Sequence, residues 1–133
     1  MRPLTKEWIK KADSDLRTMR REHRVLEDPS YDAVCFHAQQ CAEKLLKAFL
    51  HTHDIYFPRT HDIGELLMLA LPVRPEWSAL VPRYKFLTDF AVDSRYPGES
   101  AFKEEADEAV EACEELRKIV LREFRDLDQL RLG

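Results

Sequence analysis

Glycine and cysteine are both scarce in this 133-residue chain, which contains 3 Gly and 3 Cys. Few glycines, together with abundant Ala, Leu, Glu, Lys and Arg, favour helices. Cys35, Cys41 and Cys113 are odd in number and show no paired metal-ligand spacing, so we expect buried, reduced thiols. The chain also lacks a glycine-rich phosphate loop, a Ser-His-Asp order and a metal-ligand cluster. We therefore expect no bound metal and no cofactor.

Long apolar runs are missing as well. No uninterrupted apolar run approaches the roughly 20 residues that span a membrane. The first residues include Arg2 and Lys6 in place of an apolar signal segment, so we expect a cytoplasmic protein without membrane contact. The length suits one domain over residues 1–133. The net charge of -4 excludes a globally basic nucleic-acid-binding protein, so such binding requires a local patch.

The segment Asp28–His53 is predicted to form the central helix, with Asp28 as its cap and Pro29 at its first position. Its apolar side chains cover an arc too wide for an ordinary surface helix, which indicates packing on more than one side. The remaining arc carries a polar stripe, whose members recur at spacings of three and four residues. The apolar arc contains Val34, Cys35, Ala38, Cys41, Ala42, Leu45, Leu46, Ala48, Phe49 and Leu50, and the polar stripe contains His37, Gln40, Lys44, Lys47 and His51.

Four further helices are predicted from apolar periodicity and from capping residues. Thr5, Thr60 and Ser100 are the expected caps, and Leu26 and Phe102 are expected to belong to apolar faces. Short connections predict antiparallel neighbours, and the fold class is therefore an all-α, up-and-down bundle of four to five helices. The expected ranges are Thr5–Leu26, His61–Leu71, Pro82 or Arg83 to Ser94, and Ser100–Asp126.

Arginines are dense in the predicted first helix, where two interpretations remain open. They can contact phosphates, or they can form a solvated face that pairs with carboxylates of the same helix. We favour the second, because oppositely charged residues three or four positions apart stabilise helices. The arginines are Arg17, Arg20, Arg21 and Arg24, and the carboxylates are Asp13, Asp15 and Glu22.

Residues 36–48, FHAQQCAEKLLKA, resemble the second-helix signature of the HEPN domain. Three further motifs resemble the same family and occur in the same order along the chain. The resemblance extends from Lys10 to Ile119. The three motifs are ADSDL at 12–16, RTHDI at 59–63 leading to Leu66 and Leu67, and RYPG at 95–98.

The resemblance implies an all-α bundle like the substrate-binding subunits of nucleotidyltransferases, often a homodimer, that associates with nucleotides or RNA. Family members often partner a minimal nucleotidyltransferase, in some cases as a toxin–antitoxin pair. Many are metal-independent ribonucleases whose motif is an arginine, four to six residues and a histidine near the last core helix. Arg95 stands at the arginine position, but no histidine follows, because the last one is His61. Arg17 and His23 have the spacing, but they lie about 120° apart on one helix. We therefore do not expect ribonuclease activity by the family mechanism.

The candidate ligand site combines Arg95, Tyr96 and the polar stripe. Arg95 beside the amides of a helix N-terminus makes an anion site, and Tyr96 can stack on a base. Alternatively, Arg95 pairs with Asp93 or Glu99 while Tyr96 covers the core, and the stripe is a solvated or dimer-facing surface. The residues predicted to contact a nucleotide or RNA phosphate are Arg95, Tyr96, Lys44, Lys47, Gln40 and His37.

Three functions follow from these observations. The first is a dimeric HEPN-type protein that binds a nucleotide or RNA phosphate and partners a minimal nucleotidyltransferase. The second is a ribonuclease toxin that uses Arg95 with His61 or His37 as the acid–base group. The third is a structural interaction bundle without a ligand.

Overall fold

The computed structural model describes residues 1–92 and 96–132, with side chains as far as residue 125. The described residues form helices and connecting loops, without a strand. The all-α fold predicted from the sequence is therefore confirmed. In chain order the elements are α1 (Pro3–His23), α2 (Tyr31–Thr52), α3 (Ile63–Leu69), the 3₁₀ helix η1 (Pro75–Ala79), α4 (Leu80–Tyr84), the 3₁₀ helix η2 (Lys85–Phe90) and α5 (Lys103–Leu132).

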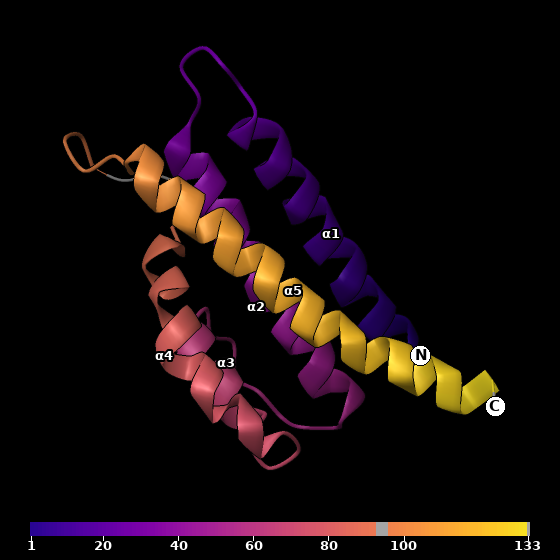
Figure 1. Ribbon diagram of the computed structural model, residues 1–133. Coiled ribbons are helices and arrows are strands. Elements are labelled where there is room, and N and C mark those ends of the chain that lie inside the picture. The colour runs from indigo at the N-terminus through magenta and orange to yellow at the C-terminus, as the bar shows by residue number, and fades with distance from the viewer. Residues whose placement is uncertain (93–95, 133) are drawn as a thin grey trace.

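Helix α2 lies at the centre of the bundle, with α1 and α5 along it and the α3-to-η2 segment covering another side (Figure 1). Thirteen of its 22 residues are buried, which confirms packing on more than one side. Helices α1 and α2 are antiparallel, as expected for a short connection. Helices α2 and α5 instead run parallel, because the α3-to-η2 segment returns the chain to the start of α2. The backbone N–H of Ala101 donates to Asp32 there, over 2.7 Å.

The helix starts differ from their predicted positions. Ser30 caps α2, its hydroxyl accepting from the N–H of Ala33, whereas Asp28 lies in the preceding loop with a φ of 51°. Thr5 does not cap α1, which begins at Pro3; its buried hydroxyl lies 2.7 Å from His51 Nδ1. Side-chain caps can occur at several neighbouring polar residues, so sequence places them only within a few positions.

The start of helix α3 is capped by Asp62, with the predicted cap Thr60 in a supporting role. The side chain of Asp62 accepts from the N–H of Glu65 over 3.0 Å, and Asp62 is therefore the N-cap. Thr60, the predicted cap, supports it instead by accepting from the N–H of Asp62. The predicted range His61–Leu71 shortens to Ile63–Leu69.

The helix predicted from Pro82 or Arg83 to Ser94 is wrong in its period and its end. The chain forms α4 as far as Tyr84 and then the tighter η2 as far as Phe90. Tyr84, Leu87 and Phe90 are all buried and are spaced three residues apart. A 3₁₀ helix has about three residues per turn, so this geometry places all three on the inner face. Ser94 lies outside the described residues.

Helix α5 begins at Lys103, three residues after the predicted cap Ser100, and continues to Leu132 beyond the predicted Asp126. The side chain of Glu105 accepts from the N–H of Phe102, as in a capping box. Phe102 is 69% exposed and does not belong to the core. Leu26, expected on the apolar face of the first helix, is 96% exposed because α1 ends at His23.

All three cysteines are free and buried, as predicted. A hydrogen bond to Cys113 and burial raise the pKa of Cys41 well above its usual value. The reactive form of cysteine is the thiolate, and a raised pKa keeps Cys41 protonated. The Cys41–Cys113 pair therefore serves as a packing contact between α2 and α5. Among the described residues, no helix is long and apolar enough to cross a bilayer.

Candidate functional site

The polar stripe of α2 faces α1, where a single carboxylate binds two of its members. Asp15, which is 9% exposed, lies 2.8 Å from His37 Nδ1 and accepts from Lys44 Nζ over 2.5 Å. Farther along, His51 contacts Thr5. The ammonium group of Lys44 is therefore neutralised between two helices, and a phosphate would have to displace Asp15.

Lys47 belongs to a buried ion pair with Glu43. Its Nζ donates to Glu43 over 3.0 Å, and the two residues are 6% and 4% exposed. The ammonium lies 5.6 Å from the ring centroid of Trp8 and 5.9 Å from that of Phe57, which adds cation–π attraction. Lys47 is thus enclosed by protein groups that satisfy its charge.

Glu43 gathers the remaining polar groups of this region. Gln39 donates to the carboxylate over 3.1 Å and to the carbonyl of His61 over 2.8 Å. Gln40 donates to the side-chain carbonyl of Gln39 over 2.7 Å. His61 Nδ1 lies 2.8 Å from Glu43, while the rest of its side chain is open to solvent. This network fixes the loop before α3 against α2.

The predicted site residues are therefore brought together only in part. His37 and Lys44 meet at Asp15, and Gln40 joins Lys47 through the network around Glu43. Tyr96 is 80% exposed in the segment between η2 and α5, and no hydrogen bond links its side chain to the stripe in the described chain. Arg95 lies outside the described residues.

A line of cations on the outer face of α1 forms a different surface, here called the α1 strip. Its members are spaced by four, seven, four and three residues, which places them on one side of the helix. All are exposed, and none forms an ion pair with a described residue. The α1 strip consists of Lys6, Lys10, Arg17, Arg21 and Arg24.

The carboxylates expected to neutralise these cations have partners elsewhere, so the predicted pairing within the first helix is wrong. Asp13 faces Arg117 of α5 at 3.6 Å, and Asp15 faces α2. Glu22 accepts from the backbone N–H of Ser30. The α1 strip is consequently more positive than its sequence context suggests.

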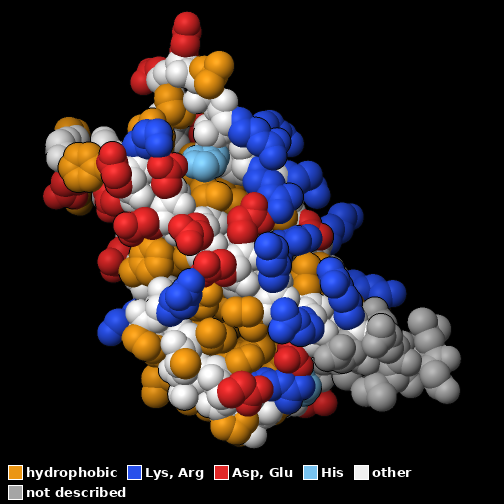
Figure 2. All heavy atoms as spheres, in the orientation of Figure 1, with side chains coloured by type: hydrophobic (Ala, Val, Ile, Leu, Met, Phe, Trp, Pro, Cys, Tyr) orange, Lys and Arg blue, Asp and Glu red, His pale blue; other side chains and the backbone are white. Residues whose placement is uncertain are grey.

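Charge is also segregated over the face of the molecule that Figure 2 draws. Figure 2 shows lysine and arginine side chains gathered along α1 and near the middle of α5, and carboxylates over the first half of α5. Lys118, Arg122 and Arg125 are exposed on α5 at spacings of four and three residues. The net charge of -4 therefore conceals a local basic surface of the kind that phosphate binding requires.

A bidentate ion pair holds α1 against α5 beside this surface. Arg20 Nε and Nη2 donate to the two carboxylate oxygens of Glu114 over 2.8 and 2.6 Å. The hydrogen bond from Arg20 is the main reason that the pKa of Glu114 lies below its usual value. Arg20 thus differs from the arginines of the α1 strip, because Glu114 neutralises its charge.

Replacing Glu114 with glutamine is expected to cost about 0.5–1 kcal/mol at pH 7 and almost nothing near pH 2. The pKa of Glu114 is lower in the folded than in the unfolded chain, so the pair stabilises the fold above the unfolded value of about 4.3. That contribution is lost as the pH falls through the folded-state pKa. Urea unfolding at both pH values measures the difference, with Glu111→Gln as the exposed control. An equal cost at both pH values would contradict the role of Arg20.

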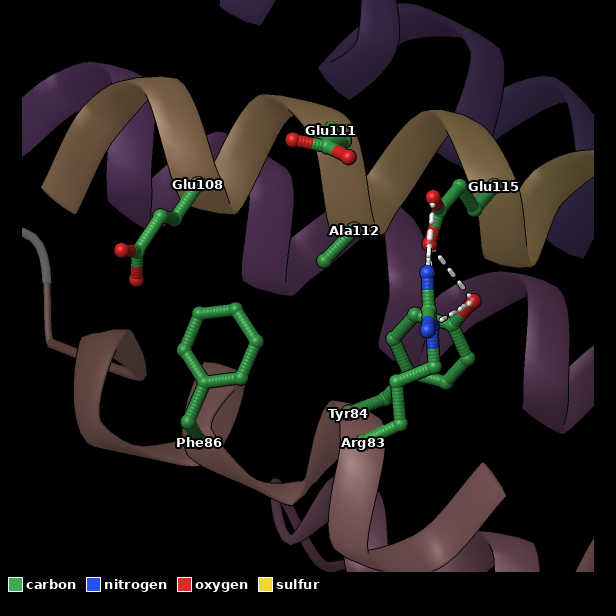
Figure 3. A pocket seen from close by; sticks show the side chains of 7 residues that line it. All are labelled: Arg83, Tyr84, Phe86, Glu108, Glu111, Ala112 and Glu115. Atoms are coloured by element: carbon green, nitrogen blue, oxygen red, sulfur yellow. Dashed lines mark hydrogen bonds and ion pairs between the residues drawn. The ribbon is translucent and has the colours of Figure 1, made fainter. Parts of the chain in front are cut away.

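A second polar site lies between α4, η2 and α5. It is a groove of about 170 Å³ in which Phe86 lies opposite the α5 carboxylates (Figure 3). Arg83 and the hydroxyl of Tyr84 both donate to Glu115. The pKa of Tyr84 is raised, mainly by burial and next by its hydrogen bond to Glu115. Glu108 and Glu111 line the same groove. Their negative charge disfavours a phosphate there.

Among the described residues, no three or more histidine, cysteine or carboxylate side chains are arranged so that they could hold a metal ion together.

Comparison with known proteins agrees with this architecture. The chain is 27% identical to the protein named Putative toxin MJ1304 from Methanocaldococcus jannaschii, with 92% of this chain and 91% of that protein covered. It is 27% identical to ST0689, described as an archaeal HEPN homologue, with a TM-score of 0.70 over 90% of this chain and 96% of that one. It matches TT1696 from Thermus thermophilus with the same identity and TM-score, over 89% and 96% of the two chains. The sequence model of the HEPN domain matches residues 5–124, and the chain belongs to the HEPN family.

Proposed function

We propose that this HEPN domain is a cytoplasmic, toxin-like protein that binds RNA by its phosphate backbone along the α1 strip. The observation that carries this proposal is the set of four exposed cations on one face of α1, continued by Arg24 at its C-cap, none of them ion-paired with a described residue. Lysine and arginine that neutralise phosphates release condensed counterions, which supplies most sequence-independent affinity for nucleic acids. Lys44 and Lys47 are less suited to this role, because each already has a carboxylate partner.

The length of the α1 strip favours a polymer over a single nucleotide. Lys6 and Arg24 are 18 residues apart, which corresponds to about 27 Å along a helix. A nucleotide offers phosphates at one end only, whereas a strand offers one at every step. The arginines can bind phosphate oxygens in a bidentate manner. Since the α1 strip contains no aromatic residue, it is suited to backbone contacts without base readout.

The partners predicted from the family resemblance form the second part of the proposal. They are a minimal nucleotidyltransferase and a second copy of this chain. The similarity to a protein named as a toxin supports such a module. Light scattering of the purified 15.7 kDa chain tests whether it forms a homodimer. Co-purification with a nucleotidyltransferase encoded beside it tests the other partner.

Removal of charge from the α1 strip is expected to abolish tight RNA binding. The variant combines Lys10→Gln, Arg17→Gln and Arg21→Gln, and fluorescence anisotropy with a labelled single-stranded RNA measures its affinity. Glutamine retains helix propensity, so the fold is kept. The matched control replaces Arg59, Arg83 and Lys85 with glutamine, which removes the same charge at exposed positions away from α1.

Equal loss of affinity in both variants would show a general charge effect and contradict the α1 strip as the binding surface. The same samples on a denaturing gel separate binding from cleavage. Intact RNA in the parent sample supports a binding module. Cleaved RNA favours the ribonuclease, for which the exposed His61, oriented by Glu43, is the available acid–base group.

A further inference from the structure

The α1 strip ends at a cavity that no role described above uses. The cavity measures about 470 Å³ and lies between the end of α1, the loop that follows it, the start of α2 and the first turn of α5. Val25, Pro29 and Tyr31 supply apolar and aromatic walls. The volume falls within the range of roughly 300–1,000 Å³ that is usual for small-molecule sites.

Three polar side chains converge on this cavity from α1 and α5. Asp107 lies 2.8 Å from His23 Nε2 and accepts from Lys103 Nζ over 2.7 Å. The hydrogen bonds from His23 and then Lys103 lower the pKa of the Asp107 carboxyl. The cavity therefore presents a carboxylate acceptor and cationic or imidazole donors beside an aromatic wall.

Arg24 connects the α1 strip with the cavity, because it is the last member of the strip and also lines the cavity. A strand whose phosphates follow α1 arrives at the mouth of the cavity. We propose that the cavity holds one unstacked nucleobase of the bound RNA, with its ring against Tyr31 and its polar edge toward Asp107 and Lys103. This inference rests on the proposed function of the α1 strip.

The chemistry of the cavity fits a base better than a phosphate. Asp107 already neutralises Lys103, which weakens the attraction of that cation for a phosphate, and its carboxylate oxygens can accept hydrogen bonds from the ring or amino N–H groups of a base. A base is apolar on its faces and polar at its edge, which matches an aromatic wall beside hydrogen-bonding groups. Single-stranded RNA is commonly bound by stacking of splayed bases on aromatic side chains.

The test compares a labelled single-stranded RNA with a strand of equal length that lacks all its bases. The parent is expected to bind the normal strand about tenfold more tightly, since stacking of one base contributes of this order. Tyr31→Ala is expected to lose this preference while keeping its affinity for the base-free strand. Val25→Trp, which narrows the cavity and leaves Tyr31 in place, is expected to do the same.

Tyr56→Ala is the control, because Tyr56 is 83% exposed and follows the other end of α2. Equal binding of both strands by the parent would overturn the base site and leave the α1 strip intact. A preference that survives Tyr31→Ala and Val25→Trp, or that disappears in Tyr96→Ala, would also overturn it. Failure to bind either strand would overturn the proposed function as well.

Discussion

Replacing Lys47 with methionine is expected to lower the free energy of unfolding by about 3–5 kcal/mol. Glu43 is 4% exposed in the parent, and the change removes its cation, so that Gln39 and His61 are the partners left to its carboxylate among the described residues. Methionine retains the apolar contact with Trp8 and Phe57 but loses the cation–π attraction. Urea unfolding followed by circular dichroism measures the change.

Two further variants decide whether the buried charge causes this loss. Lys47→Met combined with Glu43→Gln removes both charges and is expected to recover much of the stability, because glutamine still accepts from Gln39. Lys85→Met, at an exposed cation, is expected to stay within about 0.5 kcal/mol of the parent. A stable Lys47→Met protein with weakened RNA binding would instead identify Lys47 as a ligand contact, as first predicted.

The second large effect concerns the α1 strip, where the triple glutamine variant is expected to bind RNA about 100-fold more weakly. A pair of unit charges about 4 Å apart in water contributes about 1 kcal/mol, so three lost contacts cost about 3 kcal/mol. The dependence of affinity on salt changes in parallel. Each phosphate contact contributes about 0.7 to the log–log slope for a single strand, so the variant should show a slope shallower by about 2. An unchanged slope would contradict direct phosphate contacts by these residues.

The central helix could be predicted from the sequence because its signals are local. The apolar residues of α2 recur at helical spacing, and their wide arc correctly indicated a helix enclosed on several sides. The start was misplaced because Asp28 and Ser30 are both good caps, and only the path of the loop decides between them. The parallel course of α2 and α5 depends on how the intervening segment packs, which periodicity does not encode.

The α4 and η2 region shows where local signals fail. The sequence predicts an α-helical period from Pro82 or Arg83 to Ser94, but Tyr84, Leu87 and Phe90 are buried at a three-residue period. Contacts from elsewhere in the chain favour this geometry, including the bond between Thr88 and the backbone of Ile63. Tertiary packing therefore overrides a helix propensity that is only a weak preference.

The candidate site was only partly predictable, because charge neutralisation depends on distances between helices. Lys44 and Lys47 resembled free cations in the sequence, but Asp15 and Glu43 neutralise them in the fold. From its spacing in the sequence, the same carboxylate, Asp15, is predicted to neutralise arginines of its own helix. The spacing of the α1 strip is visible in the sequence, whereas the absence of partners in the described chain becomes clear only in the structure.

The most direct test of the account is to map where RNA contacts the protein. A single-stranded RNA that contains 4-thiouridine is crosslinked to the parent protein by ultraviolet light, and mass spectrometry identifies the attached residues. We predict crosslinks along α1, between Lys6 and Arg24, and at the adjoining cavity near Tyr31. Crosslinks confined to the α2 stripe between His37 and His51, or to the segment around Tyr96, would contradict the α1 strip as the RNA-binding surface.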